Sequence, residues 1–112
     1  MSFVREGSLN AAACLLVVTT SSAVGQTNGD AGRGLVYAQK VCAECHAVMA
    51  LQPISPQPGV TPFKVIANAP GMTPTAIFVW LQTPHPTMPN LMIDAADKAD
   101  VIAYIASLKV AQ

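Results

Sequence analysis

The stretch Cys42-Ala43-Glu44-Cys45-His46 is the motif from which the fold and the function of the chain are predicted. Cysteines three positions apart on a helical turn lie on the same side, so each thiol can add to a vinyl group of one porphyrin and form a thioether. His46 follows directly, so its imidazole can bind the iron from one face of the porphyrin ring. Because Cys-x-x-Cys-His is typical of covalent haem attachment, the sequence predicts one haem c, with Cys42 and Cys45 as tethers and His46 as the proximal iron ligand.

Three other uses of the cysteine pair compete with haem attachment. A thioredoxin-like redox pair needs a βαβ context, which the sequence does not offer. A zinc site needs a second pair of ligands, and His85 is the only other histidine. A structural disulfide is the third alternative. The histidine that directly follows the second cysteine, together with the export signal over residues 1–25, favours haem over all three.

A low-spin electron carrier needs a second axial ligand for its iron. The sequence offers five candidates, namely Met49, Met72, Met88, Met92 and His85. Met49 lies only three residues after His46 and cannot reach the opposite face of the ring. Met88 lies in an irregular segment far enough along the chain to wrap around the haem, so Met88 is the predicted distal ligand. A thioether ligand raises the reduction potential relative to a second histidine. Met72 and Met92 are interpreted as packing residues and His85 as a loop residue.

Residues 1–25 have the layout of a cleaved secretory signal. Arg5 precedes an apolar run over residues 9–18, and small residues follow the run. The run is shorter than the roughly 20 residues that span a bilayer, so an uncleaved anchor is the lesser alternative. Cys14 lies inside the run and is expected to leave with the leader. The predicted boundaries are therefore a signal over 1–25 and one exported domain over 26–112.

Length, charge and composition limit what the domain can be. The chain has 112 residues, six basic and six acidic side chains, and a formal net charge of zero. With no basic face, binding to nucleic acid is not expected. Aromatic residues make up only 5% of the chain. A domain this small commonly needs a disulfide, a metal or a cofactor to complete its core.

Apolar periodicity and capping residues predict helices but no strand. Thr73 and Pro74 form a good helix start, and Asp94 can cap the last helix. Proline-rich segments over 51–62 and 85–91 are predicted loops. The fold class is therefore all-α with long loops, and the predicted helical segments are 31–41, 63–68, 74 to about 83, and 95–108.

The haem motif near the start, Met88-Pro89 further along and a terminal amphipathic helix together resemble class I c-type cytochromes. Several shorter stretches resemble small periplasmic cytochromes of alphaproteobacteria, among them Gly32-Arg33-Gly34, Pro70-Gly71-Met72-Thr73 and His85-Pro86-Thr87-Met88-Pro89-Asn90-Leu91. The resemblance implies the cytochrome c fold, with three to four helices and long loops wrapped around one covalently bound haem. It also places the exported protein in the periplasm.

The same resemblance implies particular contacts. The first and last helices should cross near-perpendicularly, with Gly34 letting Tyr104 approach. A backbone carbonyl after the haem motif should accept the other N–H of the proximal histidine, and Thr61 or Pro62 could supply it. Trp80 either packs on the haem edge, bonds a propionate, or belongs to the core.

Three functions are compatible with these expectations. The predicted one is a monomeric periplasmic one-electron carrier, not an enzyme, that exchanges electrons with a redox protein donor and acceptor and has no stable membrane insertion. The first alternative is an electron-transfer subunit of a periplasmic dehydrogenase, because a nearly uncharged protein gains little from long-range steering. The second alternative is a haem enzyme or sensor in which Met88 leaves the iron.

Overall fold

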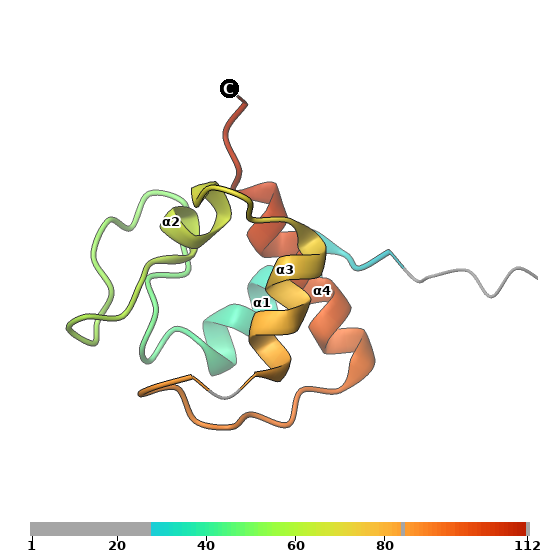
Figure 1. Ribbon diagram of the computed structural model, residues 1–112, viewed down its shortest axis with the longest axis horizontal. Coiled ribbons are helices and arrows are strands. Elements are labelled where there is room, and N and C mark those ends of the chain that lie inside the picture. The colour runs from blue at the N-terminus through green and yellow to red at the C-terminus, as the bar shows by residue number, and fades with distance from the viewer. Residues whose placement is uncertain (1–27, 84, 112) are drawn as a thin grey trace, which may run out of the picture.

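The computed structural model describes residues 28–83 and 85–111. The predicted signal over 1–25, with Cys14, lies outside the described residues. Within those two ranges the chain forms helices and no strand, so the all-α prediction is confirmed (Figure 1). No helix in the described part of the chain is long and apolar enough to cross a membrane. The four helices are α1 (Ala31–Val41), α2 (Phe63–Asn68), α3 (Pro74–Gln82) and α4 (Ala95–Ser107).

Side chains at the N-termini account for where three helices begin. Asp30, Thr73 and Asp94 precede α1, α3 and α4, and each side chain accepts the backbone N–H three residues further on, at 2.7, 3.1 and 2.9 Å. Such bonds satisfy a backbone donor that has no partner inside the helix. Pro74 occupies the first turn of α3, where its missing N–H costs nothing. The predicted caps at Thr73 and Asp94 are confirmed, and Asp30 adds one that the pattern had not indicated.

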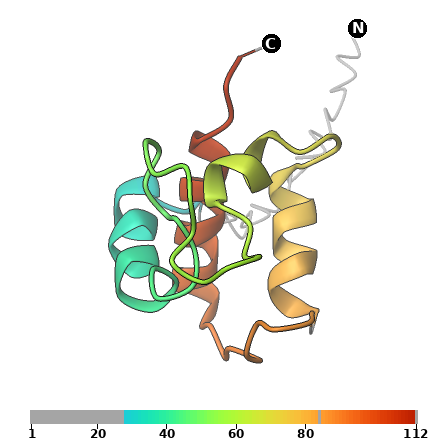
Figure 2. The ribbon, with the colours of Figure 1, turned by 90° about the vertical axis from the view of Figure 1, so that its left-hand side faces the viewer.

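Helix α4 is the centre of the packing. It contacts α1, α2 and α3, and in the described residues those three helices do not pack on one another. Figure 2 shows α4 standing between α1 and α3. The core that results is built from all four helices and the segment after α1, and its buried members are Ala38, Cys42, Val48, Phe63, Ala67, Ile77, Val101, Tyr104 and Ile105.

Helices α1 and α4 approach each other closely at Gly34. A Cβ atom at this position would overlap the backbone carbonyl of Asp100 and lie 2.8 Å from the Cβ of Tyr104. Gly29, just before α1, is closed off in the same way by the backbone of Ala99. The contact between Gly34 and Tyr104 that the family resemblance implied is therefore present, and glycine is required because the neighbouring atoms belong to the backbone.

Asp100 joins the N-terminal end of α1 to α4. Its carboxylate is 6% exposed. Arg33 donates to it twice, from Nε at 2.7 Å and from Nη2 at 3.0 Å, and the backbone N–H of Asp30 donates at 2.6 Å. The hydrogen bond from Arg33, followed by that from Asp30, holds the pKa of Asp100 below its usual range. A buried carboxylate is tolerated here because its oxygens have these donors.

This arrangement predicts a pH-dependent contribution to stability. The pKa of Asp100 is lower in the folded chain than in the unfolded chain, so the contribution is present above about pH 4 and lost as the pH falls below it. We expect Asp100→Asn to lower the unfolding temperature at pH 7, with a smaller gap to wild type at pH 3. Thermal unfolding followed by circular dichroism at both pH values checks this. A gap of equal size at both would show that the charge of Asp100 contributes nothing.

Candidate haem site

The two cysteines of the haem motif lie on a turn that continues α1. The N–H of Cys42 donates to the carbonyl of Ala38 at 2.8 Å. The N–H groups of Cys45 and His46 both donate to the carbonyl of Cys42, at 3.2 and 2.9 Å. These bonds have the spacing of a helical turn, the geometry that the motif predicts. Both cysteines are free thiols, which argues against a structural disulfide.

The surroundings of the pair argue against the other two uses, because a thioredoxin-like pair needs a βαβ unit and the described residues form no strand. Burial of Cys42, which is 9% exposed, raises the pKa of its thiol to about 11, and the neighbouring Cys45 adds to the shift. In residues 28–83 and 85–111, moreover, no three His, Cys, Asp or Glu side chains are grouped so that they could hold a metal ion.

The ring of His46 is held in one tautomer. Its Nδ1 lies 2.7 Å from the carbonyl oxygen of Thr61. Because a carbonyl oxygen can only accept, Nδ1 carries a proton, and in the neutral imidazole Nε2 then has the lone pair that binds a metal. Of the two residues that the resemblance implied for this carbonyl, Thr61 supplies it. The ring of Phe63 packs against the ring of His46 with a centroid distance of 5.1 Å.

We call residues 42–47 the haem turn. Two side-chain hydroxyls, which the sequence did not predict, form hydrogen bonds at the start of the loop between the haem turn and α2. The backbone N–H of Ala47 donates to Oγ of Ser55 at 3.0 Å, inside the protein. The hydroxyl of Tyr104 donates to the carbonyl of Val48 at 2.5 Å. A serine among prolines gives no local signal of such a bond, because its partner is set by the path of the loop.

Met88 lies on the loop between α3 and α4, away in sequence from the other three site residues. Its side chain is half-buried, and its N–H donates to the carbonyl of His85 at 3.3 Å. The preceding Thr87 has φ of 71°, which is rare for a β-branched residue and marks a constrained turn. Figures 1 and 2 both place this loop, drawn in orange, at the same end of the molecule as the C-terminal end of α1.

The other candidate ligands have different surroundings. Met72 packs against the core, as predicted. Met92 does not, because it is 93% exposed while Ile93 takes the buried position, so the interpretation of Met92 as a packing residue is wrong. Met49 is exposed, and its sulfur accepts a hydrogen bond from Gln39 at 3.5 Å.

His85 and Trp80 form a pair beside the end of α3. His85 is half-buried, with Nδ1 3.0 Å from the carbonyl of Thr83. Its ring meets the ring of Trp80 edge to face, with centroids 5.6 Å apart. Trp80 itself is 54% exposed, so the alternative that it is a core residue is wrong.

Helix α3 leaves an unusually large share of its apolar side chains exposed. Its sequence is apolar nearly all round, yet Ile77 is its only buried residue. A helix of this composition is normally buried on all sides. Here Phe78, Val79 and Trp80 are 42%, 54% and 54% exposed. The free thiols of Cys42 and Cys45 and the Nε2 atom of His46 fit a covalently attached haem.

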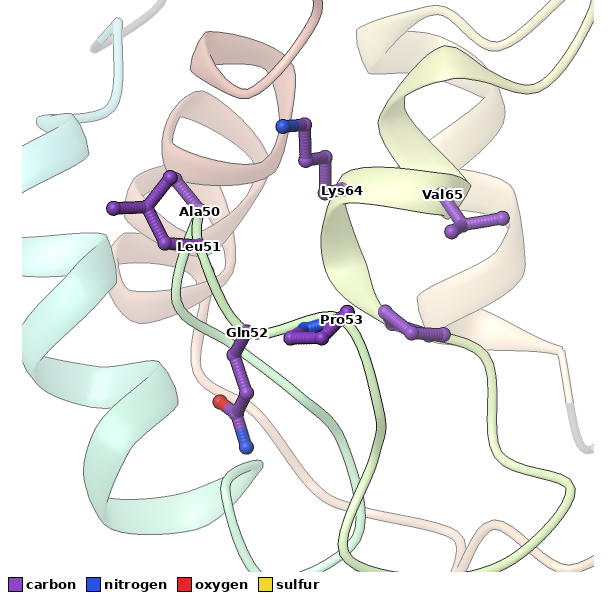
Figure 3. A pocket seen from close by; sticks show the side chains of 7 residues that line it. Ala50, Leu51, Gln52, Pro53, Lys64 and Val65 are labelled. Atoms are coloured by element: carbon purple, nitrogen blue, oxygen red, sulfur yellow. The ribbon is translucent and has the colours of Figure 1, made fainter.

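A shallow pocket of about 350 Å³ lies apart from these residues, between the loop after the haem turn and the start of α2 (Figure 3). It is lined by Ala50, Leu51, Gln52, Pro53, Pro62, Lys64 and Val65. Because neither cysteine of the motif nor His46 contributes to the lining, we do not assign the haem to this pocket.

These observations together are typical of a c-type cytochrome. The domain is all-α, its first helix leads into a Cys-x-x-Cys-His turn with free thiols, and the histidine can bind a metal through Nε2. The chain is 32% identical over 96 residues to cytochrome c-552 of Bradyrhizobium diazoefficiens. The matched region covers 86% of this chain and 91% of the relative. The chain belongs to the family of small c-type cytochromes. No family model and no solved structure matches it.

Proposed function

We propose that the protein is a periplasmic one-electron carrier whose single covalently bound haem c is ligated by His46 and Met88. The observation that carries the proposal is the hydrogen bond from Nδ1 of His46 to the carbonyl of Thr61, at 2.7 Å. It orients the ring of a histidine that directly follows Cys45 and lies close in sequence to a second free thiol, that of Cys42. Membership of the c-type cytochromes supports a haem c electron carrier rather than an enzyme.

Each site residue has a defined task. Cys42 and Cys45 tether the group through thioethers, so it stays attached when the iron ligands are lost. His46 offers Nε2 to the iron, and the Thr61 carbonyl makes its imidazole a stronger electron donor. Met88 brings a thioether from the loop between α3 and α4. When bound, the haem supplies reversible one-electron oxidation and reduction. Were His46 and Met88 both to hold the iron, no coordination site would remain for a substrate.

The location and the partners follow from other parts of the chain. The proposed signal over residues 1–25 takes the domain into the periplasm. A redox protein donor and a redox protein acceptor then exchange electrons with the haem. A net charge of zero gives little long-range steering, so these partners recognise shape and apolar surface at short range. Exposed Leu51 and Ile54 are available for such contacts and equally allow permanent docking on a dehydrogenase.

Replacing Met88 tests the proposed ligand set. We expect oxidised wild-type protein to show the weak far-red charge-transfer band of sulfur ligation, and Met88→Ala to lose it completely. The reduced variant should also bind carbon monoxide, because an axial position has opened. Absorption spectra of the oxidised and reduced proteins measure both effects.

Met92→Ala is the matched control, because Met92 is 93% exposed and should leave the spectrum unchanged. A band that survives Met88→Ala would assign the ligand to another methionine. A wild type without the band would point to His85 or to an open site, and the alternative of an enzyme or sensor would then be preferred.

A further inference from the structure

We propose that Ser55 is a positioning residue for His46. Its buried hydroxyl holds the proline-rich loop so that the Thr61 carbonyl meets the imidazole. The inference rests on the proposed role of His46 as an iron ligand, and it assigns a function to a residue that does not itself touch the haem-binding groups.

The loop buries its serine and exposes its neighbour. Ser55 is 8% exposed, whereas Ile54 is 78% exposed. Hydrophobicity alone favours the reverse arrangement, because isoleucine is among the residues most often buried and serine is mostly exposed. A buried hydroxyl costs free energy unless it is hydrogen-bonded. The bond that offsets this cost is the one from Ala47, whose 0% exposure leaves its N–H no access to water.

Three consecutive residues of the haem turn are hydrogen-bonded to this loop. The carbonyl of Cys45 accepts the backbone N–H of Gln57 at 3.3 Å. The ring of His46 donates to the carbonyl of Thr61 at 2.7 Å. The N–H of Ala47 donates to the hydroxyl of Ser55 at 3.0 Å. Ser55 is the only loop partner among these three that uses its side chain. Ser55→Ala therefore removes one of the three contacts from the loop side while the backbone of the loop and His46 are kept.

The loop depends on such ties because it has few bonds of its own. Four prolines lie within residues 51–62, and each lacks a backbone donor. Without the Ser55 hydroxyl, the segment that ends at Thr61 is less restrained next to His46. The bond from Nδ1 to Thr61 then weakens, and the imidazole donates less electron density to the iron. A weaker donor favours the reduced iron, so the reduction potential rises.

The test compares Ser55→Ala with Ser55→Thr, which keeps the hydroxyl, and with Ser107→Ala as a matched control. Ser107 donates to the carbonyl of Tyr104 at the end of α4, in a bond that does not involve the loop. The readouts on haem-loaded protein are the reduction potential, by spectroelectrochemistry, and solvent exchange of the His46 Nδ1 proton, by NMR. We expect Ser55→Ala to raise the potential and speed the exchange, Ser55→Thr to restore both, and Ser107→Ala to change neither.

A lower unfolding temperature in Ser55→Ala, with the potential and the exchange rate unchanged, would show that Ser55 is only structural and would overturn the proposal. Equal shifts in Ser107→Ala, or no recovery in Ser55→Thr, would also count against it. A measurement on wild type covers a variant that fails to fold: the Ala47 amide should be protected from exchange, and immediate exchange would contradict the proposal. Wild-type protein that carries no haem would instead overturn the proposed function itself.

Discussion

Replacement of both Cys42 and Cys45 with alanine is expected to abolish haem staining of the denatured protein. Denaturation removes the axial bonds, so only thioethers can keep haem on the chain in a denaturing gel. Wild-type protein should stain strongly, and the double variant not at all. The experiment needs expression with haem maturation machinery, followed by in-gel staining and mass measurement of the intact chain.

Cys14→Ala is the control for this experiment, because Cys14 is predicted to leave with residues 1–25. It should stain like wild type, and the mass of the purified protein should correspond to a chain that begins near residue 26. Haem that stays attached in the double variant would disprove the assignment of Cys42 and Cys45. A mass that includes residues 1–25 would show that the leader is retained and would weaken the proposed location.

Substitution of Gly34 with alanine is expected to destabilise the fold by about 3 kcal/mol, the upper end of the usual range for overpacking. The new methyl group would overlap the carbonyl of Asp100, which is backbone and cannot rotate away. Helices α1 and α4 would have to separate, and the hydrogen bonds from Arg33 and Asp30 to Asp100 would lengthen. For a domain of this size the unfolding temperature should fall by more than about 10 °C.

Gly32→Ala is the matched control on the same helix. Its Cβ would approach only Oδ1 of Asp30, at 3.2 Å, so this capping carboxylate has to shift slightly but no backbone atom is overlapped. Because alanine has a higher helix propensity than glycine, the change in stability should stay within about 1 kcal/mol. Thermal or denaturant unfolding of both variants measures the difference. Equal stability of Gly34→Ala and Gly32→Ala would show that α1 and α4 can adjust at this contact.

The helices could be predicted because their limits depend on nearby residues. Thr73 and Pro74 start α3, Asp94 starts α4, and the prolines after α3 end it, all within one or two turns of chain. The turn of Cys42 and Cys45 was predictable for the same reason, since their spacing alone places both thiols on one turn. The four-helix, all-α outcome therefore follows from local chemistry.

Several contacts of the fold and of the candidate site could not be predicted, because their partners are distant in sequence. Asp100 accepts hydrogen bonds from Arg33, 67 residues away, and from Asp30, 70 residues away. Ser55 and Gly29 gave no pattern that identified their neighbours. The prediction for Met92 was wrong for a related reason. In an extended segment alternate residues face opposite sides, and the composition of the segment does not determine that Ile93, and not Met92, faces the core.

The central place of α4 has a consequence for the order of events in biosynthesis. Because α1, α2 and α3 pack on α4 and not on one another in the described residues, a chain without α4 lacks the helix that joins these three. Cys42 belongs to the core cluster that also contains Val101, Tyr104 and Ile105 of α4, so its burial depends in part on residues that follow it far along the chain. Because such long-range contacts close late, we expect the thiols to be accessible to haem before the core has formed.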